Sequence, residues 1–208
     1  MLRWITRVSC FCVLMLAASF TVAQAEFSAE IVDLQKSGTP AQARIYFAKD
    51  KMRIEAQTAS AHGSAVIINY ATQAVDVLMA QQHMYMEMPM QGQSQRMGYA
   101  AAFFQAGDVE NACDDWQKMG HEGSSCHKVG SETVNGRSTV KYETTNASGD
   151  VSHFWLDPKL RFPVKWEGKN SNGELRNIQE GAQPASLFEI PAGFTKMEIP
   201  GGMMQQPR

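Results

Sequence analysis

The chain has 208 residues, of which 44% are hydrophobic, and it carries 19 basic against 21 acidic residues, a formal net charge of −2. That near-balance, without a dense basic cluster, argues against nucleic-acid binding. The length suits one domain with a substantial core, and it leaves little room for a second.

The first 25 residues have the organisation of a secretory signal peptide. Arg3 and Arg7 flank the start of an apolar run over Val8–Phe20, and Ala23-Gln24-Ala25 forms a cleavage site before Glu26. The apolar run is shorter than the ~20 residues that a membrane-spanning helix needs. We therefore expect cleavage near Ala25, a periplasmic or secreted protein, and no transmembrane span afterwards.

The next segment, up to Pro89, is predicted to form an antiparallel meander of six strands. Apolar and polar residues alternate along it, and connections as short as Lys49-Asp50 join neighbouring strands antiparallel. The predicted strands are Phe27–Gln35, Ala41–Ala48, Lys51–Gln57, Ser64–Tyr70, Ala74–Met79 and His83–Met88.

Residues 91–125 read as an insert of helix and loop that packs over one face of this sheet. Apolar residues at helical spacing predict a helix over Met97–Gln105, and Asp114–Met119 is predicted to form a short helical turn. The insert is too short to have a core of its own, so the whole of residues 26–200 is expected to be a single domain.

Strand signals return after Cys126, with Asn135-Gly136 as the strongest hairpin turn and Asn172-Gly173 as another. The predicted strands are Lys128–Val134, Arg137–Thr145, Val151–Leu156, Phe162–Lys169 and Glu174–Gln179. Ser186–Ile190 is predicted to be a helical turn or edge segment, and the polar tail 201–208 to be disordered. The total is about eleven mostly antiparallel strands with one or two helices.

Two cysteines, Cys113 and Cys126, remain after cleavage of the signal peptide. In an oxidising compartment an isolated pair predicts one disulfide. Metal or redox use of the pair is the alternative, which their spacing of 13 residues does not favour.

The third strand of the stretch from Ser64 to Pro89 carries an unusual run of methionines. Met84, Met86 and Met88 alternate with Tyr85 and Glu87, so the three thioethers share one face. Such a face is apolar and deformable. It is interpreted as a core strand under the insert, as the lining of a cavity for an acyl chain or another apolar ligand, or as a Cu(I) site. The candidate cavity residues are Val66, Ile68, Val75, Val77, Met84, Met86 and Met88, and the alternative copper ligands are His83, Met88, Met90 and Met97.

No catalytic constellation stands out in the sequence. The motifs of the common serine hydrolases, nucleotide-binding enzymes and zinc proteases do not occur. Cys126 and His127 are neighbours on a strand and point to opposite faces, so they do not form a nucleophile and base. We therefore expect a protein without enzymatic activity and without a cofactor.

Six runs of the sequence together carry a family likeness. They are Asp50–Glu55, Val66–Tyr70, His83–Pro89, Ser131–Arg137, Phe154–Lys165 and Leu187–Met197. In this order they resemble a bacterial family of secreted domains of unknown function, and more loosely the outer-membrane lipoprotein carrier superfamily. The resemblance implies a mainly β (α+β) fold, a curved antiparallel half-barrel whose concave face is covered by helices. In the carriers that hollow accepts acyl chains.

The sequence therefore favours a non-enzymatic envelope protein that binds or carries an apolar, lipid-like molecule in the hollow of a curved sheet. The alternatives are a periplasmic copper-binding protein using residues 83–97, and a structural envelope protein that binds a protein partner. Which face of the sheet is concave depends on register and bulges, and the sequence leaves it open.

Overall fold

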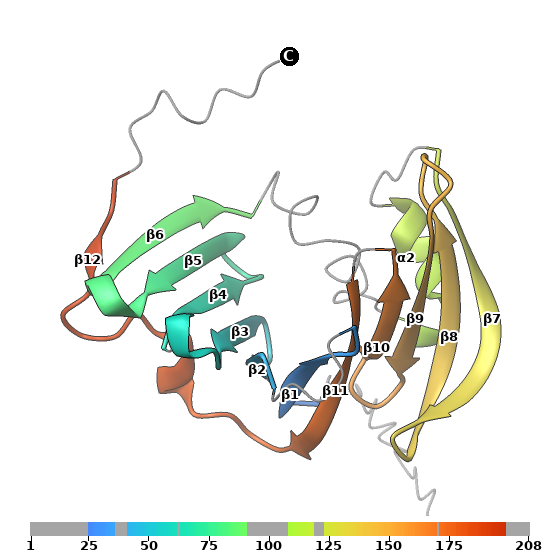
Figure 1. Ribbon diagram of the computed structural model, residues 1–208, viewed down its shortest axis with the longest axis horizontal. Helices are drawn as coiled ribbons and strands as arrows, with labels where there is room; N and C mark the ends of the chain where they lie inside the picture. Colours follow the sequence, from blue (N-terminus) through green and yellow to red (C-terminus); the bar gives the residue numbers. More distant parts are fainter. Residues whose placement is uncertain are drawn as a thin grey trace, which may run out of the picture.

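The computed structural model describes residues 25–35, 41–61, 63–90, 108–118, 123–169 and 171–198. These residues form one strongly curved, unclosed sheet of twelve strands in the order β12-β6-β5-β4-β3-β2-β1-β11-β10-β9-β8-β7 (Figure 1). The strands are β1 (Phe27–Asp33), β2 (Ala43–Ala48), β3 (Lys51–Ala56), β4 (Ala65–Asn69), β5 (Ala74–Met79), β6 (Met84–Pro89), β7 (Ser125–Val134), β8 (Arg137–Thr145), β9 (Val151–Asp157), β10 (Phe162–Gly168), β11 (Ser171–Glu180) and β12 (Thr195–Lys196). The described helical elements are η1 (Ala59–Ala61), η2 (Ala80–Gln82), η3 (Val109–Asn111), α2 (Ala112–Lys118) and η4 (Ala185–Phe188). The mainly β, half-barrel fold expected from the sequence is confirmed.

The predicted six-stranded meander is present, because each of the strands β1 to β6 pairs antiparallel with the next. The short connections take backbone conformations that close them tightly: Lys49 and Gln73 both lie in the left-handed region, at φ 51° and 55°. Asn69 accepts hydrogen bonds at Oδ1 from the backbone N–H groups of Ala71 and Thr72, both at 3.1 Å. A side chain therefore organises the β4–β5 turn.

Strand β1 joins the two halves of the sheet. It pairs on one side with β2, where Phe27 lies opposite Phe47, and on the other with β11, where Ile31 lies opposite Leu175. The ring of Phe162, from β10, contacts both Phe27 and Phe47, with centroids 5.2 and 5.9 Å away. The meander and the later hairpins therefore share one core.

The core lies along one face of the sheet. Residues that pair across neighbouring strands mark this face from β1 to β5. Five apolar side chains on these strands form a row of direct neighbours in which none is more than 3% exposed. We call it the buried row: Phe27, Phe47, Met52, Ile68 and Val75.

The same face continues across the other half of the sheet, where α2 covers it. Trp166 lies opposite Phe154, and Phe154 opposite Tyr142. These side chains cluster with Trp116 of α2, which is 1% exposed. Because Trp166 also packs against the cluster that contains the buried row, the two cores are continuous.

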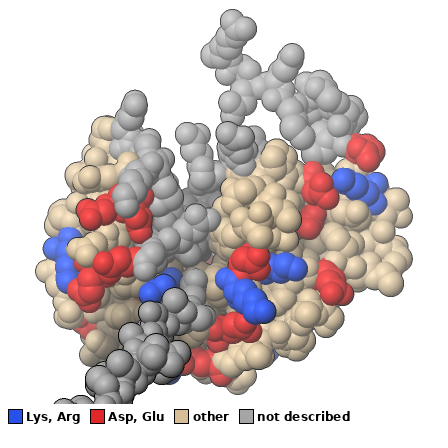
Figure 2. Space-filling view, turned by 180° about the vertical axis from the view of Figure 1, so that it is seen from behind, with Lys and Arg blue, Asp and Glu red and all other residues tan. Residues whose placement is uncertain are grey.

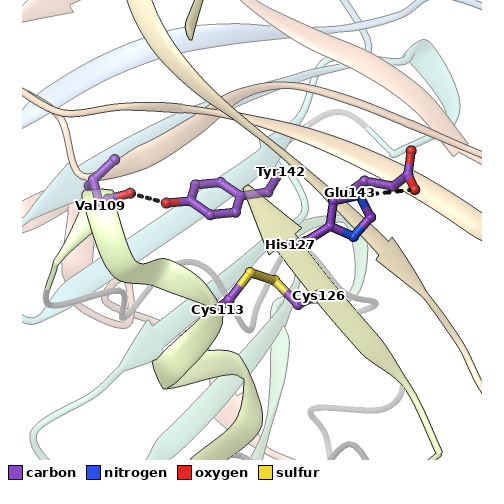
Figure 3. The surroundings of a disulfide bond; sticks show 6 residues. All are labelled: Val109, Cys113, Cys126, His127, Tyr142 and Glu143. Atoms are coloured by element: carbon purple, nitrogen blue, oxygen red, sulfur yellow. Dashed lines mark hydrogen bonds and ion pairs between the residues drawn. A yellow bond between two sulfur atoms is a disulfide. The ribbon is translucent and has the colours of Figure 1, made fainter. Parts of the chain in front are cut away.

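The disulfide between Cys113 and Cys126 is confirmed, and it ties α2 to the start of β7 (Figure 3). Beside it, the buried hydroxyl of Tyr142 donates a hydrogen bond to the carbonyl oxygen of Val109 at 2.7 Å. The helical turn predicted over Asp114–Met119 corresponds to α2. The predicted signal peptide, the helix over Met97–Gln105 and the tail 201–208 lie outside the described residues.

The segment from η4 to β12 covers the opposite, outer face of the meander. Phe188 clusters there with Ile67 and Leu78, and Arg53 donates from Nη1 to the carbonyl oxygen of Leu187 at 3.2 Å. Figure 1 shows this segment following the outside of the curve before it reaches β12. The core face is therefore the concave one. Of the two alternatives predicted for Ser186–Ile190, the helical turn corresponds to η4, and the edge strand β12 begins only at Thr195.

The turn predicted at Asn172-Gly173 is wrong. Both residues lie inside β11, and the chain reverses three residues earlier, because Gly168 and Ser171 are the last pair of the β10–β11 hairpin. Gly173 lies directly opposite Trp166, and a Cβ atom placed on Gly173 would be 2.4 Å from Cζ2 of that ring. The glycine is needed because the Trp166 indole packs closely on the backbone. An Asn-Gly pair in the sequence does not show whether its glycine serves such packing or a turn.

Gly173→Ala is expected to lower the free energy of unfolding by about 1–3 kcal/mol, because the new methyl group overpacks the site beneath Trp166. Urea denaturation of the purified protein measures the effect. In a Trp166→Leu background the same substitution should cost much less, since the clashing ring is gone. An equal cost in both backgrounds would contradict this explanation of the glycine.

Candidate ligand-binding face

The structure places all seven predicted cavity residues on one face, the concave one. Ile68, Val75 and Met88 are direct cross-strand neighbours, and so are Val66, Val77 and Met86. Met84, at the start of β6, lies opposite Met79. Period-two alternation along each strand and the antiparallel register together bring these side chains side by side.

The seven residues differ in exposure, and the difference divides the face into two rows. Ile68 and Val75 are 0% and 3% exposed and belong to the core. Val66, Val77 and the three methionines of β6 are only partly buried. Ile54 of β3, which lies opposite Val66, is also partly buried. We call the set Ile54, Val66, Val77 and Met86 the accessible row.

The chemistry of these two rows is uniform across β1 to β6. Every member is apolar. The cross-strand pairs of the buried row lead on to Met88, which is partly buried, and those of the accessible row lead on to Ile45 and Ala29, which are 1% and 0% exposed. A branched aliphatic floor with thioethers at its β6 end suits an apolar molecule of irregular shape, because methionine side chains adapt with little strain. Ile54 completes this row and was missed by sequence reasoning, although its alternation with Arg53 and Glu55 was visible.

Tyr70, directly after β4, places a polar group on this apolar face. It continues the alternation of Val66 and Ile68, and its ring packs against the core cluster that contains the buried row. Burial raises the pKa of its phenol, so the hydroxyl is neutral at physiological pH. Sequence reasoning treated this residue only as the end of a strand.

Two of the alternative copper ligands, His83 and Met88, lie apart from each other. His83 lies at the start of β6 and packs its ring against Phe194 on the outer-face side, with centroids 5.7 Å apart. Met88 lies five residues further along the strand, roughly 16 Å away, on the concave face. Met97 is outside the described residues. Within the part of the chain that the structure describes, no group of three or more histidine, cysteine or acidic side chains is arranged to hold a metal ion.

Two of the remaining histidines share one carboxylate. Nε2 of His153 lies 2.9 Å from one oxygen of Glu143, and Nε2 of His127 lies 3.3 Å from the other (Figure 3). The three residues are cross-strand neighbours on β7, β8 and β9. Both imidazoles therefore have Glu143 as their partner.

A surface cleft of about 350 Å³ lies at one end of the second half of the sheet. It is lined by Gly136, Arg137, Ser138, Asp157, Pro158, Lys159 and Glu180. The guanidinium of Arg137 binds the carboxylates of Asp157 and Glu180, so the charges in the cleft neutralise one another. Hydrogen bonds from Lys159 and Arg137 hold the pKa of Glu180 below its usual range. The cluster ties three strand ends together and leaves no net charge to attract a ligand.

The face of the molecule drawn in Figure 2 carries acidic and basic side chains interspersed among uncharged residues. Charged side chains of the described residues form ion pairs, for example Lys169 with Asp150 and Lys165 with Glu167, at 2.8 and 2.7 Å. The uniformly apolar concave rows stand in contrast to this surface.

No protein-family model and no curated protein matches the sequence. Solved structures match its fold. An uncharacterized conserved protein from Thermus thermophilus is 10% identical, with a TM-score of 0.53 over 85% of this chain and 91% of that chain. MucB from Pseudomonas aeruginosa, in its structure with MucA, is 16% identical, with a TM-score of 0.48 over 83% of this chain and 58% of that chain.

A Vibrio parahaemolyticus domain assigned to outer-membrane lipoprotein sorting is 13% identical, with a TM-score of 0.31 over 78% of this chain and 87% of that chain. At these identities the likeness concerns the fold alone. Among the described residues, no helix has the length and apolar character to cross a membrane.

Proposed function

We propose that this protein is a non-enzymatic binding or carrier protein of the bacterial cell envelope, and that it holds an apolar, lipid-like molecule in the hollow of its curved sheet. The ligand lies along the accessible row, over Val66, Val77 and Met86, with the buried row beside it. The signal-peptide pattern of residues 1–25 and the disulfide between Cys113 and Cys126 support an exported protein in an oxidising compartment.

One observation carries the proposal: the concave face keeps a row of apolar side chains partly exposed directly beside a row that is fully buried. A face that only served as core would be expected to bury both rows. Partly exposed apolar side chains in a concave surface are typical of ligand sites, where the ligand completes the burial.

Native mass spectrometry of the mature protein purified from a periplasm tests the proposal. We expect a mass above that of the bare polypeptide, and organic extraction of the same sample should release it as a lipid. Delipidated protein incubated with an uncharged apolar fluorophore, N-phenyl-1-naphthylamine, should enhance its fluorescence. A bare polypeptide that also fails to bind this fluorophore would refute the proposal, and an added mass matching copper would favour the metal alternative.

A further inference from the structure

Hydrogen bonds hold the backbone of Tyr70 in place, although the residue lies in a turn. Its backbone N–H donates to the carbonyl oxygen of Asp50 at 2.8 Å, and its own carbonyl oxygen accepts from Nε2 of Gln73 at 2.7 Å. The turn that follows is organised by the side chain of Asn69. The ring therefore projects from a fixed backbone onto the concave face.

The hydroxyl of Tyr70 is closed to solvent, and no described residue lies within hydrogen-bonding distance of it. Buried phenol groups in proteins normally find a partner, because a buried donor without one is unfavourable. The neighbouring buried row offers none, since Ile68 and Val75 are hydrocarbons. The donor capacity of this hydroxyl is thus unused within the described part of the chain.

We propose that Tyr70 is the polar anchor of the site and donates a hydrogen bond to an acceptor oxygen, such as an ester or carboxyl oxygen, of an otherwise apolar ligand. This inference rests on the proposed function and narrows its ligand class from any apolar molecule to an acyl compound with an acceptor group at one end. The raised pKa of the phenol is in keeping with this role, because the neutral form keeps the proton that is donated.

In this proposal Met90 is the side chain that moves to admit the ligand. Its backbone N–H donates to the carbonyl oxygen of Gln73 at 2.8 Å, and its side chain packs against the same core cluster as Tyr70. An unbranched thioether can change rotamer at little cost. Ile68 of the buried row lies between Tyr70 and Val66 on the chain, so the acyl chain crosses the buried row to reach the accessible row.

Tyr70→Phe tests the anchor on the full mature protein. Methyl dodecanoate, which offers only acceptor oxygens, and tridecane, which offers none, are each titrated against bound N-phenyl-1-naphthylamine. The measured quantity is the preference for the ester over the hydrocarbon, expressed as the ratio of their two affinities. Because this ratio is compared between variants, the difference in solubility between the two probes cancels. Tyr85→Phe is the matched control, because Tyr85 lies on the outer face of β6.

We expect the wild type to prefer the ester, Tyr70→Phe to lose about fivefold of that preference, and Tyr85→Phe to retain it. Thermal unfolding of Tyr70→Phe without ligand should occur at the wild-type temperature or above, since an unpaired buried hydroxyl is removed. A Tyr70→Phe protein with the wild-type preference, or a wild type that binds both probes equally, would overturn the anchor and leave the proposed function standing. A wild type that binds neither probe would overturn both.

Discussion

Met86→Glu is expected to abolish binding of the apolar fluorophore and of any lipid that copurifies, with a loss of at least about 100-fold in affinity. Met86 lies at the β6 end of the accessible row, directly opposite Val77 and only partly buried. A carboxylate at this position would lose its hydrating water whenever a ligand covered the accessible row, which is unfavourable for a charged group. Neither concave row of β1 to β6 contains a cationic side chain that could neutralise its charge. Fluorescence titration and native mass spectrometry measure the loss.

Met86→Leu is the matched control, because it keeps the volume and apolar character of the side chain. It should bind within a few-fold of the wild type. Near-ultraviolet circular dichroism establishes that both variants remain folded, which their partly exposed position favours. Retention of ligand by a folded Met86→Glu protein would show that the ligand does not use this face.

Removing the disulfide by Cys113→Ser together with Cys126→Ser is expected to lower the free energy of unfolding by about 3 kcal/mol. The bond closes a short loop, with a sequence separation of 13, and the estimate follows from the entropy that this closure removes from the unfolded chain. The loss should be concentrated in α2, which packs on β8 and β9 through Trp116. Guanidinium denaturation measures the global effect, and hydrogen exchange of α2 measures the local one.

Reduction of the wild type with dithiothreitol provides an independent control for the serine substitutions. Reduced wild type and the double variant should unfold at the same denaturant concentration, both below the oxidised wild type. If the oxidised wild type and the double variant were equally stable, packing of Trp116 and the hydrogen bond from Tyr142 to Val109 would suffice to hold α2.

Local sequence signals predicted the strands well and one turn badly. The strands predicted over Ser64–Tyr70 and Ala74–Met79 were recognisable because alternation with period two is a local property of the chain. The Asn172-Gly173 pair failed because the same dipeptide that favours a turn also permits a glycine under an indole, and Trp166 comes into contact with it only through the hairpin. A turn signal of two residues carries no information about the partner strand.

For the candidate site, the sequence by itself determined which side chains share a face of each strand. Alternation places Met84, Met86 and Met88 together whatever the rest of the fold does. It also determined the disulfide, since Cys113 and Cys126 are the only cysteines after residue 25.

Only the tertiary structure decided which face is concave and which of its rows stays accessible. The C-terminal segment packs Phe188 on the outer face, and β1 bridges the two halves of the sheet, so the methionine face becomes the inside of the curve. Ile68 is 0% exposed and clusters with Phe162, whereas Val66, two residues away on the same strand, is only partly buried. The packing of Phe188 on Ile67 and the pairing of β1 with β11 join residues more than a hundred positions apart, so a local alternation pattern cannot predict them.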